Sequence, residues 1–270
     1  MFPFASQKSF FLTTGMFCLK TTEAEIFIDL SYTLSNNTIY YPGSQGYTLS
    51  RDSEGIRGSG ALEYWYAAFS FCTGEHGGTH LDAPYHFFKN GWTVEQIPNS
   101  RLINVQATLI NVEEAVKELA SPGDFKLEVE HLIEHEKEFG GIEPNGLFLV
   151  YTGWSKFWPD KVKYLGYENK TEDGQFALRF PGISEDAIKW LVEERQIVGI
   201  GLDTPSTDQG MDQRYPVHLF AASRQVYNLE NVANLHQLLG YRRREIRIFV
   251  LPLKIVGGTG APARILAAVH

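Results

Sequence analysis

The sequence predicts an α/β protein, because short apolar segments of strand length alternate along the chain with segments of helical periodicity. Residues 146–152 and 197–202 are apolar runs that fit buried strands. Ser184 can cap a helix between them, and apolar residues then recur at helical spacing: Ala187, Ile188, Leu191 and Val192. With 270 residues, 43% of them hydrophobic, the chain can bury a large core, and we expect one domain over residues 26–270.

The N-terminal half continues this alternation. Residues 25–30 read as a first strand. Residues 60–73, rich in aromatic side chains, read as an apolar strand that leads into a histidine-rich segment. Residues 105–112 read as another strand, after which Asn111 can cap a helix. The histidine-rich segment is therefore expected between two strands.

The C-terminal half adds a loop, a turn and a last strand. Residues 159–175 form a polar insertion that we expect to be a surface loop or a lid. Residues 247–256 read as the final strand. The glycine-rich residues 257–260 lack the lysine of a phosphate-binding loop, so we expect a tight turn close to the functional site.

One helical segment carries a metal motif that we expect not to bind metal. His131 and His135 match the H-x-x-E-H pattern of one class of zinc proteases. In a helix they would lie opposite the apolar side chains of the segment, which are Val129, Leu132, Ile133 and Phe139. A catalytic zinc helix would bury its histidines, whereas these share a face with glutamates. We therefore predict a solvated helix surface.

Charge and composition restrict the partners. A net charge of −8 provides no basic surface for nucleic acid or an anionic membrane. No apolar run reaches the roughly 18 residues of a membrane span. Cys18 and Cys72 are too few for a disulfide framework or a cysteine-rich zinc site. We expect a small-molecule substrate, with no nucleic-acid or membrane partner.

Residues 1–25 allow two interpretations. Lys8 and the apolar residues that follow resemble a short signal segment, but the threonines and the glycine among them weaken this interpretation, and no A-x-A cleavage site follows. The alternative is an N-terminal arm that packs on the domain or on a partner subunit. We favour the arm, and with it a cytoplasmic protein, and we keep secretion as the alternative.

The strongest functional pattern lies in residues 75–88, which read E-H-G-G-T-H-L-D-A-P-Y-H-F-F. The even spacing of His76, His80, Asp82 and His86 would direct their side chains to one face of a strand. The glycines and the proline of the segment disfavour a helix. One histidine beside one aspartate is usually a surface or core contact, but four such groups together favour a catalytic or metal site. Imidazole and carboxylate ligands suit a divalent metal such as Zn or Mn.

This segment resembles the pattern H-x-G-T-H-x-D-x-P-x-H-F of the cyclase-like metal-dependent hydrolases, which include bacterial-type kynurenine formamidase and isatin hydrolase. Further segments fit the same family: D-L-S-Y-T-L-S from Asp29, Y-P-G at Tyr41, T-G-W at Thr152, F-P-G at Phe180, G-L-D-T-P-S-T-D from Gly201 and G-G-T-G-A-P-A-R from Gly257. The resemblance covers residues 28–268. It implies a mixed β-sheet or barrel-like core with flanking helices, the swivelling β/β/α fold, and a homo-oligomer such as a homodimer.

The resemblance also implies an activity. The substrate would be a small aromatic amide, either an aryl formamide of the N-formylkynurenine type, as in tryptophan catabolism, or a cyclic amide such as isatin. A metal held by His76, His80 and Asp82 would activate water. His86, with an ordinary pKa of about 6.5, suits the proton transfer between water and the leaving nitrogen. An alternative of another class is a non-catalytic metal-binding protein that kept the fold.

Three more ligands follow only from the resemblance. His218 and Glu230 are twelve residues apart and would not by themselves predict a metal site. They resemble the formamidase residues that help to bind a second zinc. Gln225 resembles the glutamine that completes the single-manganese site of isatin-hydrolase-like members. One or two metal ions per chain, zinc or manganese, therefore remain open.

Four residues are candidates for supporting or substrate-binding roles. Asp203 and Asp208 follow the strand at 197–202 and could hold a metal-binding histidine in one tautomer, or serve only in turns and caps. Tyr41 could line the mouth of the site, although tyrosines in turns are commonly surface residues. Trp65 could stack on a planar substrate, although a β-rich core uses aromatic residues in the same way.

Overall fold

The computed structural model describes residues 25–167 and 177–270. The predictions for residues 1–24, and for 168–176 of the polar insertion, lie outside the described residues. None of the helices in the described ranges is long and apolar enough to cross a membrane.

The core is a mixed β-sheet that closes on itself. Its strands are β1 (Ile26–Asp29), β4 (His80–Asp82), β5 (Val105–Asn111), β7 (Leu147–Tyr151), β9 (Gly199–Leu202), β10 (Tyr227–Glu230), β11 (Ile246–Pro252) and β12 (Gly260–Val269). They lie in the order β1-β12-β11-β5-β7-β9-β10-β4, and β4 also pairs with β12. All strands except β1 therefore form a closed ring. β5, β7, β9 and β10 are mutually parallel, and the other pairs are antiparallel. The predicted α/β class and barrel-like core are confirmed.

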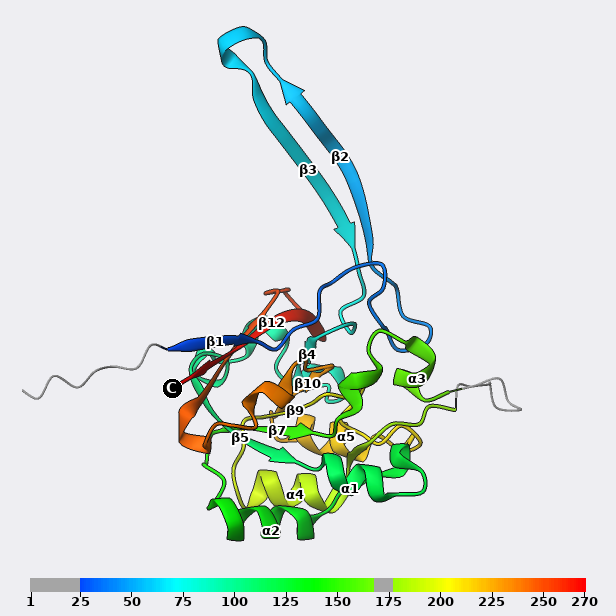
Figure 1. Cartoon of the computed structure of the whole chain (residues 1–270), viewed down its shortest axis with the longest axis vertical. Helices are drawn as coiled ribbons and strands as arrows, with labels where there is room; N and C mark the ends of the chain where they lie inside the picture. Colours follow the sequence, from blue (N-terminus) through cyan, green and yellow to red (C-terminus); the bar gives the residue numbers. More distant parts are fainter. Residues whose placement is uncertain (1–24, 168–176) are drawn as a thin grey trace, which may run out of the picture.

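Alternation along the strands divides the apolar side chains between the inside of the ring and the helices. On β7, Leu147 and Leu149 face the inner core, whereas Phe148 and Val150 pack with the helices. The helices are α1 (Glu113–Glu118), α2 (Val129–Phe139), α3 (Lys161–Leu165), α4 (Glu185–Glu193) and α5 (Pro216–Ser223). All but α3 contribute to the outer core, and α2 and α4 lie at the end of the body away from a projecting hairpin (Figure 1).

Most of the predicted elements are present. The Ser184 hydroxyl accepts a hydrogen bond from the Ala187 amide at 3.1 Å and caps α4 as predicted. Asn111 accepts one from the Glu113 amide at 3.0 Å, at the start of α1. The strands β2 (Thr48–Arg57), β10 and β12 were not predicted from the sequence. Strand β12 begins at Gly260, inside the turn predicted at residues 257–260. Only the residues before Gly260 form the turn, because Gly260 already pairs with Asp82 of β4.

The motif-bearing helix α2 is present, with a smaller apolar face than predicted. Leu132 is fully buried, but Ile133 and Phe139 are exposed because the helix touches the core along a narrow stripe. His131 is half-buried, with its ring centroid 5.4 Å from that of Phe125. Within the described parts of the chain, the side-chain groups able to hold a metal ion do not include His131 or His135.

A two-stranded hairpin projects from the body (Figure 1). It consists of β2 (Thr48–Arg57) and β3 (Tyr64–Cys72). A separate small sheet elsewhere in the chain pairs β6 (Lys126–Leu127) with β8 (Gly182–Ile183). The strand predicted at residues 60–73 exists and leads to the histidine-rich segment, but it is not a core strand. Its side chains are exposed on both faces, so its aromatic residues do not contribute to the hydrophobic core.

Candidate metal centre

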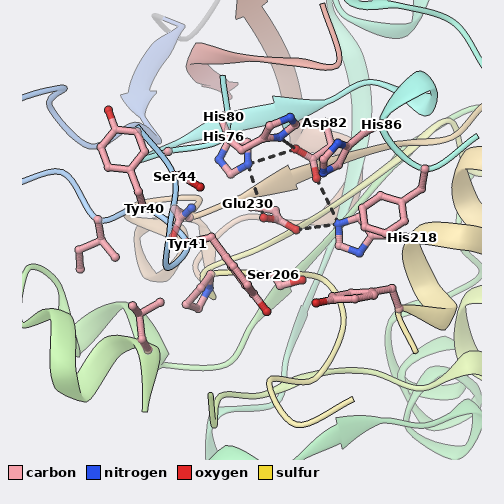
Figure 2. A pocket seen from close by; sticks show the side chains of 17 residues that line it. Tyr40, Tyr41, Ser44, His76, His80, Asp82, His86, Ser206, His218 and Glu230 are labelled. Atoms are coloured by element: carbon pink, nitrogen blue, oxygen red, sulfur yellow. Dashed lines mark hydrogen bonds and ion pairs between the residues drawn. The ribbon is translucent and has the colours of Figure 1, made fainter. Parts of the chain in front are cut away.

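Three neighbouring elements bring the candidate ligands together. β4 carries His80 and Asp82, and β10 lies beside it with Glu230 opposite His80 in the register. Helix α5 leads into β10 and carries His218. Figure 2 shows these side chains converging with that of His76 on one space.

The predicted strand is shorter than its histidine pattern suggested. Only His80 and Asp82 of the four residues lie on β4, because the chain bends at Gly77 and Gly78 before it. Gly78 has a φ of 58°, and a Cβ on Gly77 would lie 1.9 Å from the Tyr40 ring. His76 therefore reaches the site from a bend, and His86 from the 3-10 turn Pro84–His86.

Asp82 is the centre of the cluster. Its Oδ1 lies 2.6 Å from His76 Nδ1 and 3.1 Å from His80 Nε2, and its Oδ2 lies 3.1 Å from His218 Nε2. The two oxygens of one carboxylate thus face different histidines. The described residues contain two candidate ligand groups that share this aspartate: His76, His80 and Asp82, and Asp82, His218 and Glu230.

Glu230 adds a second buried carboxylate. Its Oε1 lies 3.1 Å from His218 Nε2 and its Oε2 lies 3.5 Å from His80 Nε2. Asp82 is 3% exposed and Glu230 6% exposed. Burying a carboxylate costs several kcal/mol unless positive charge compensates it. This pair therefore requires either protonated imidazoles or a cation.

His76, His80 and His218 each direct one ring nitrogen toward Asp82, and the second ring nitrogen of each lies beside a hydrogen-bond acceptor. His80 Nδ1 lies 2.9 Å from the Gly78 carbonyl, and His218 Nδ1 lies 2.5 Å from Asp208 Oδ2. His76 Nε2 lies 2.8 Å from Thr259 Oγ1. Such contacts fix a tautomer and leave the opposite nitrogen free to bind metal.

The donor set fits a divalent transition metal. His80 Nε2 is buried without a hydrogen-bond partner, although it faces two carboxylates. Buried polar atoms are rarely left without a partner, and a metal ion would accept the lone pair of His80 Nε2. Imidazole nitrogens and carboxylate oxygens are ligands of both zinc and manganese.

The electrostatics of the cluster reflect the same demand for positive charge. Burial disfavours the charged form of His80, but the charges of Asp82 and Glu230 outweigh it and raise the His80 pKa to about 9. Burial likewise opposes the charged form of His218, yet the three surrounding carboxylates raise its pKa well above its usual range. Burial would raise the pKa of Asp82, but the imidazoles lower it well below the usual range. Protons on the imidazoles and a bound cation are thus alternative ways to neutralise the carboxylates.

His86 differs from the other histidines of the site. Its ring stacks on that of His76, with centroids 3.9 Å apart, and it lines the pocket beside the cluster. Burial lowers its pKa to about 4, although the charge of Asp82 acts in the opposite direction. A neutral imidazole is therefore available next to the candidate metal centre.

A pocket of about 320 Å³ opens onto this centre. Tyr41, Phe87 and Tyr215 contribute aromatic walls, and Ser206 contributes a hydroxyl. Figure 2 shows Tyr41 and Ser206 beside the cluster. This volume is at the lower end of the range for small-molecule sites. Tyr41 thus lies where it was predicted, and burial together with Tyr215 raises the pKa of its hydroxyl.

The two candidate aspartates have different environments. Asp208 accepts from His218 Nδ1 and from the amides of Val217 and His218, which is the orienting contact predicted from the sequence. Asp203 is buried but contacts no histidine. Its carboxylate accepts hydrogen bonds from Thr152 and Ser155. Of the two roles considered for Asp203, these contacts agree with the one in turns and caps, because the carboxylate holds the loop after β7.

Two other candidates lie outside the centre. Gln225 has a φ of 59° after α5, which turns its side chain toward the Trp92 amide at 2.9 Å and the Asn90 carbonyl at 3.3 Å. Trp65 is 61% exposed on β3 of the hairpin and does not line the pocket. Neither placement within the chain supports the predicted metal or substrate contact.

Several residues of the site were not predicted from the sequence. Phe87, Ser206 and Tyr215 line the pocket, and Thr259 and Glu75 contact each other beside His76. Thr259 lies in the glycine-rich turn that was expected near the site, and Glu75 directly precedes His76. Their positions in the sequence were the only indication that Thr259 and Glu75 belong to the site. The hydrogen bond between them joins residues 184 positions apart, and no local sequence pattern predicts such a contact.

A closed mixed sheet with a buried histidine–carboxylate centre, open to a small aromatic pocket, defines a class of metal-dependent hydrolase-like proteins. The sequence model of the Cyclase family, described as "Putative cyclase", matches residues 28–209, and the chain belongs to this family. It is 33% identical to an isatin hydrolase from Roseibium aggregatum over 73% of this chain and 72% of that protein. It is 27% identical to a kynurenine formamidase from Bacillus cereus over 91% of this chain and 97% of that protein.

Solved structures show the same relationship. The structure of isatin hydrolase A from Ralstonia solanacearum superposes with a TM-score of 0.77 and 31% identity, covering 91% of this chain and 92% of that one. An isatin hydrolase bound to the product analogue thioisatinate superposes with a TM-score of 0.76 and 28% identity, covering 91% and 92%. The family predicted from the histidine-rich segment is confirmed, and the protein is a hydrolase of this family.

Proposed function

We propose that the protein hydrolyses the amide bond of a small aromatic compound with the help of a divalent metal. The observation that carries this proposal is the position of the pocket, which brings the candidate metal centre and the imidazole of His86 to the same cavity. The aromatic walls suit a planar substrate. The histidines and carboxylates of the centre would hold the metal, and Asp208 would orient His218.

The chemistry divides between the metal and His86. A bound divalent cation lowers the pKa of a coordinated water and polarises an amide carbonyl. His86 faces the same cavity and would take up the proton released by the attacking water. It would then deliver this proton to the leaving nitrogen. Tyr41 and Phe87 would flank the aromatic ring and help to exclude bulk water.

We further propose that the centre would hold two cations, one at each candidate ligand group, with Asp82 a member of both groups. The support is geometric, because Oδ1 of Asp82 faces His76 and His80 whereas Oδ2 faces His218. The alternative is a single ion whose ligands would include Gln225, which would require its side chain to leave Trp92 and Asn90.

An aryl formamide of the N-formylkynurenine type is the favoured substrate. His218 contacts both Asp82 and Glu230, and these three residues form one candidate ligand group, as expected for the formamidase-like ligand set. The side chain of Gln225 contacts Trp92 and Asn90 instead. A cyclic amide such as isatin is the second candidate. Its support is the similarity to isatin hydrolases, at 33% identity to the R. aggregatum protein.

We expect the metal-loaded protein to hydrolyse N-formylkynurenine with a higher kcat/KM than isatin. The assay compares initial rates on both compounds after loading with zinc or manganese. Removal of metal with a chelator should abolish turnover because no water would be activated, and adding the same metal back should restore it. A higher kcat/KM on isatin would reverse the order of substrates. Failure to hydrolyse either compound would favour the non-catalytic metal-binding alternative.

We also propose that the protein forms a homo-oligomer through the β2–β3 hairpin. Near the hairpin end, large side chains are exposed on both faces, with exposed fractions of 47% to 79% for Leu62, Tyr64, Trp65 and Tyr66. An isolated two-stranded hairpin is marginally stable in water, and exposed apolar patches commonly mark interfaces. A second copy of the chain offers the same surface, as symmetric association requires.

Replacing Trp65 and Tyr66 together by serine should weaken this association by about tenfold or more, because aromatic anchors dominate interface energies. Light scattering coupled to size exclusion, over a range of protein concentrations, measures the effect. Phe139→Ser is a matched control, since Phe139 is 63% exposed on α2, away from the hairpin. A wild-type protein that stays monomeric at every concentration would exclude the oligomer.

A further inference from the structure

The glycine-rich turn before β12 contacts the metal centre through one side chain. Thr259 Oγ1 lies 2.8 Å from His76 Nε2 and also donates a hydrogen bond to Glu75 Oε2. The Thr259 amide donates a second hydrogen bond to the same carboxylate oxygen at 3.1 Å. A chain of contacts therefore runs from Glu75 through Thr259 to the ring of His76.

The directions of these hydrogen bonds determine which nitrogen of His76 carries a proton. A threonine hydroxyl has one proton, and that of Thr259 is donated to Glu75. Thr259 Oγ1 can therefore only accept at His76, so His76 Nε2 must be the donor. The Nδ1 lone pair of a neutral His76 is then directed toward Asp82, which lies 2.6 Å away. His76 would bind metal through Nδ1, whereas His80 and His218 would use Nε2.

The backbone holds Thr259 firmly in this position. Its carbonyl accepts from the Ala83 amide at 2.9 Å, and the carbonyl of Gly258 accepts from the Val94 amide at 3.0 Å. Gly260 pairs with Asp82, and a Cβ at Gly260 would lie 2.4 Å from His76 Cε1. The turn therefore packs directly against the imidazole whose orientation depends on it.

We propose that Thr259 and Glu75 are positioning residues that fix the tautomer and ring orientation of His76 for metal binding. This inference rests on the metal centre of the proposed function and adds two residues to it. The contact also explains the presence of a threonine between glycines in the G-G-T-G turn. The hydroxyl provides both the acceptor for His76 and the donor for Glu75, while the glycines allow the close approach.

The test is zinc affinity, measured without substrate by equilibrium competition with a chromophoric chelator. Thr259→Val keeps the shape of the side chain but removes the hydroxyl, and should weaken zinc binding by about 10- to 100-fold, as for other residues that orient metal ligands. Thr259→Ser restores the hydroxyl and should bind zinc nearly as tightly as the wild type. Glu75→Gln should cause a smaller but measurable loss, because an amide oxygen still accepts from Thr259 but carries no charge.

Matched controls separate orientation of His76 from folding. Thr108→Val removes the hydroxyl of a threonine that is 2% exposed on β5 and lines a different groove, and should leave zinc affinity unchanged. Thermal midpoints of the metal-free variants report on folding. Wild-type affinity in Thr259→Val would overturn the proposal, as would an equal loss in Thr259→Ser. If Thr259→Val does not fold, unchanged affinity in Glu75→Gln overturns it. Because no substrate is used, tight zinc binding without amide hydrolysis would refute the proposed activity but leave this assignment intact.

Discussion

Replacing His80 by alanine is expected to abolish activity and to reduce bound metal to a small fraction of the wild-type content, with the fold retained. His80 Nε2 is the buried nitrogen without a hydrogen-bond partner, and it lies 3.1 Å from Asp82 and 3.5 Å from Glu230. Its removal takes a neutral ligand from the centre but leaves both carboxylates in place. Metal content measured by mass spectrometry on protein purified without chelator, together with circular dichroism, tests this expectation.

His135→Ala provides the matched control for this experiment. His135 is also partly buried, but it lies on α2 outside both candidate ligand groups, and its substitution should retain both metal and activity. Full activity in His80→Ala would remove the proposed mechanism. The wild-type measurement also counts the ions. Two equivalents would support one ion at each of the two ligand groups that share Asp82, and one equivalent would favour the arrangement that uses Gln225.

The part of the centre that the sequence predicted is the part that is local. His76, His80, Asp82 and His86 lie within eleven residues, so one bend, one short strand and one 3-10 turn suffice to bring them together. His218 meets Asp82 across 136 residues. That contact depends on the pairing of β10 with β4, and β10 was not recognised as a strand. Only the family resemblance could assign His218 and Glu230 to the centre.

The positions of Trp65, Gln225 and Asp203 away from the centre have identifiable physical causes. The aromatic strand containing Trp65 has the composition of a core strand, and only its pairing with the polar β2 shows that it forms an exposed hairpin. Gln225 lies near the ligands in sequence, but its left-handed backbone turns its amide toward Asn90 and Trp92. Asp203 follows a buried strand as predicted, yet its carboxylate accepts hydrogen bonds from the hydroxyls of Thr152 and Ser155. For Gln225 and Asp203, residues distant in sequence determine the side chain's partners, whereas Trp65 is exposed because its strand pairs only with the neighbouring β2.

His86→Ala is expected to separate metal binding from turnover. The imidazole of His86 is stacked on His76 and lines the pocket, but it belongs to neither candidate ligand group. Its loss should therefore leave the metal content unchanged. Turnover should fall by about 10²- to 10⁴-fold, the usual contribution of a general acid–base group. Steady-state kinetics on the favoured substrate, with metal content measured on the same preparation, test both parts.

Two further observations decide whether that loss reflects proton transfer. If His86 moves the proton, free imidazole added to His86→Ala should restore part of kcat, because the space left by the ring opens onto the pocket. If the ring of His86 instead only supports His76 by stacking, metal content would fall together with activity, and imidazole would restore neither. Unchanged turnover in the variant would exclude the proton-transfer role, and another group of the pocket would then have to protonate the leaving nitrogen.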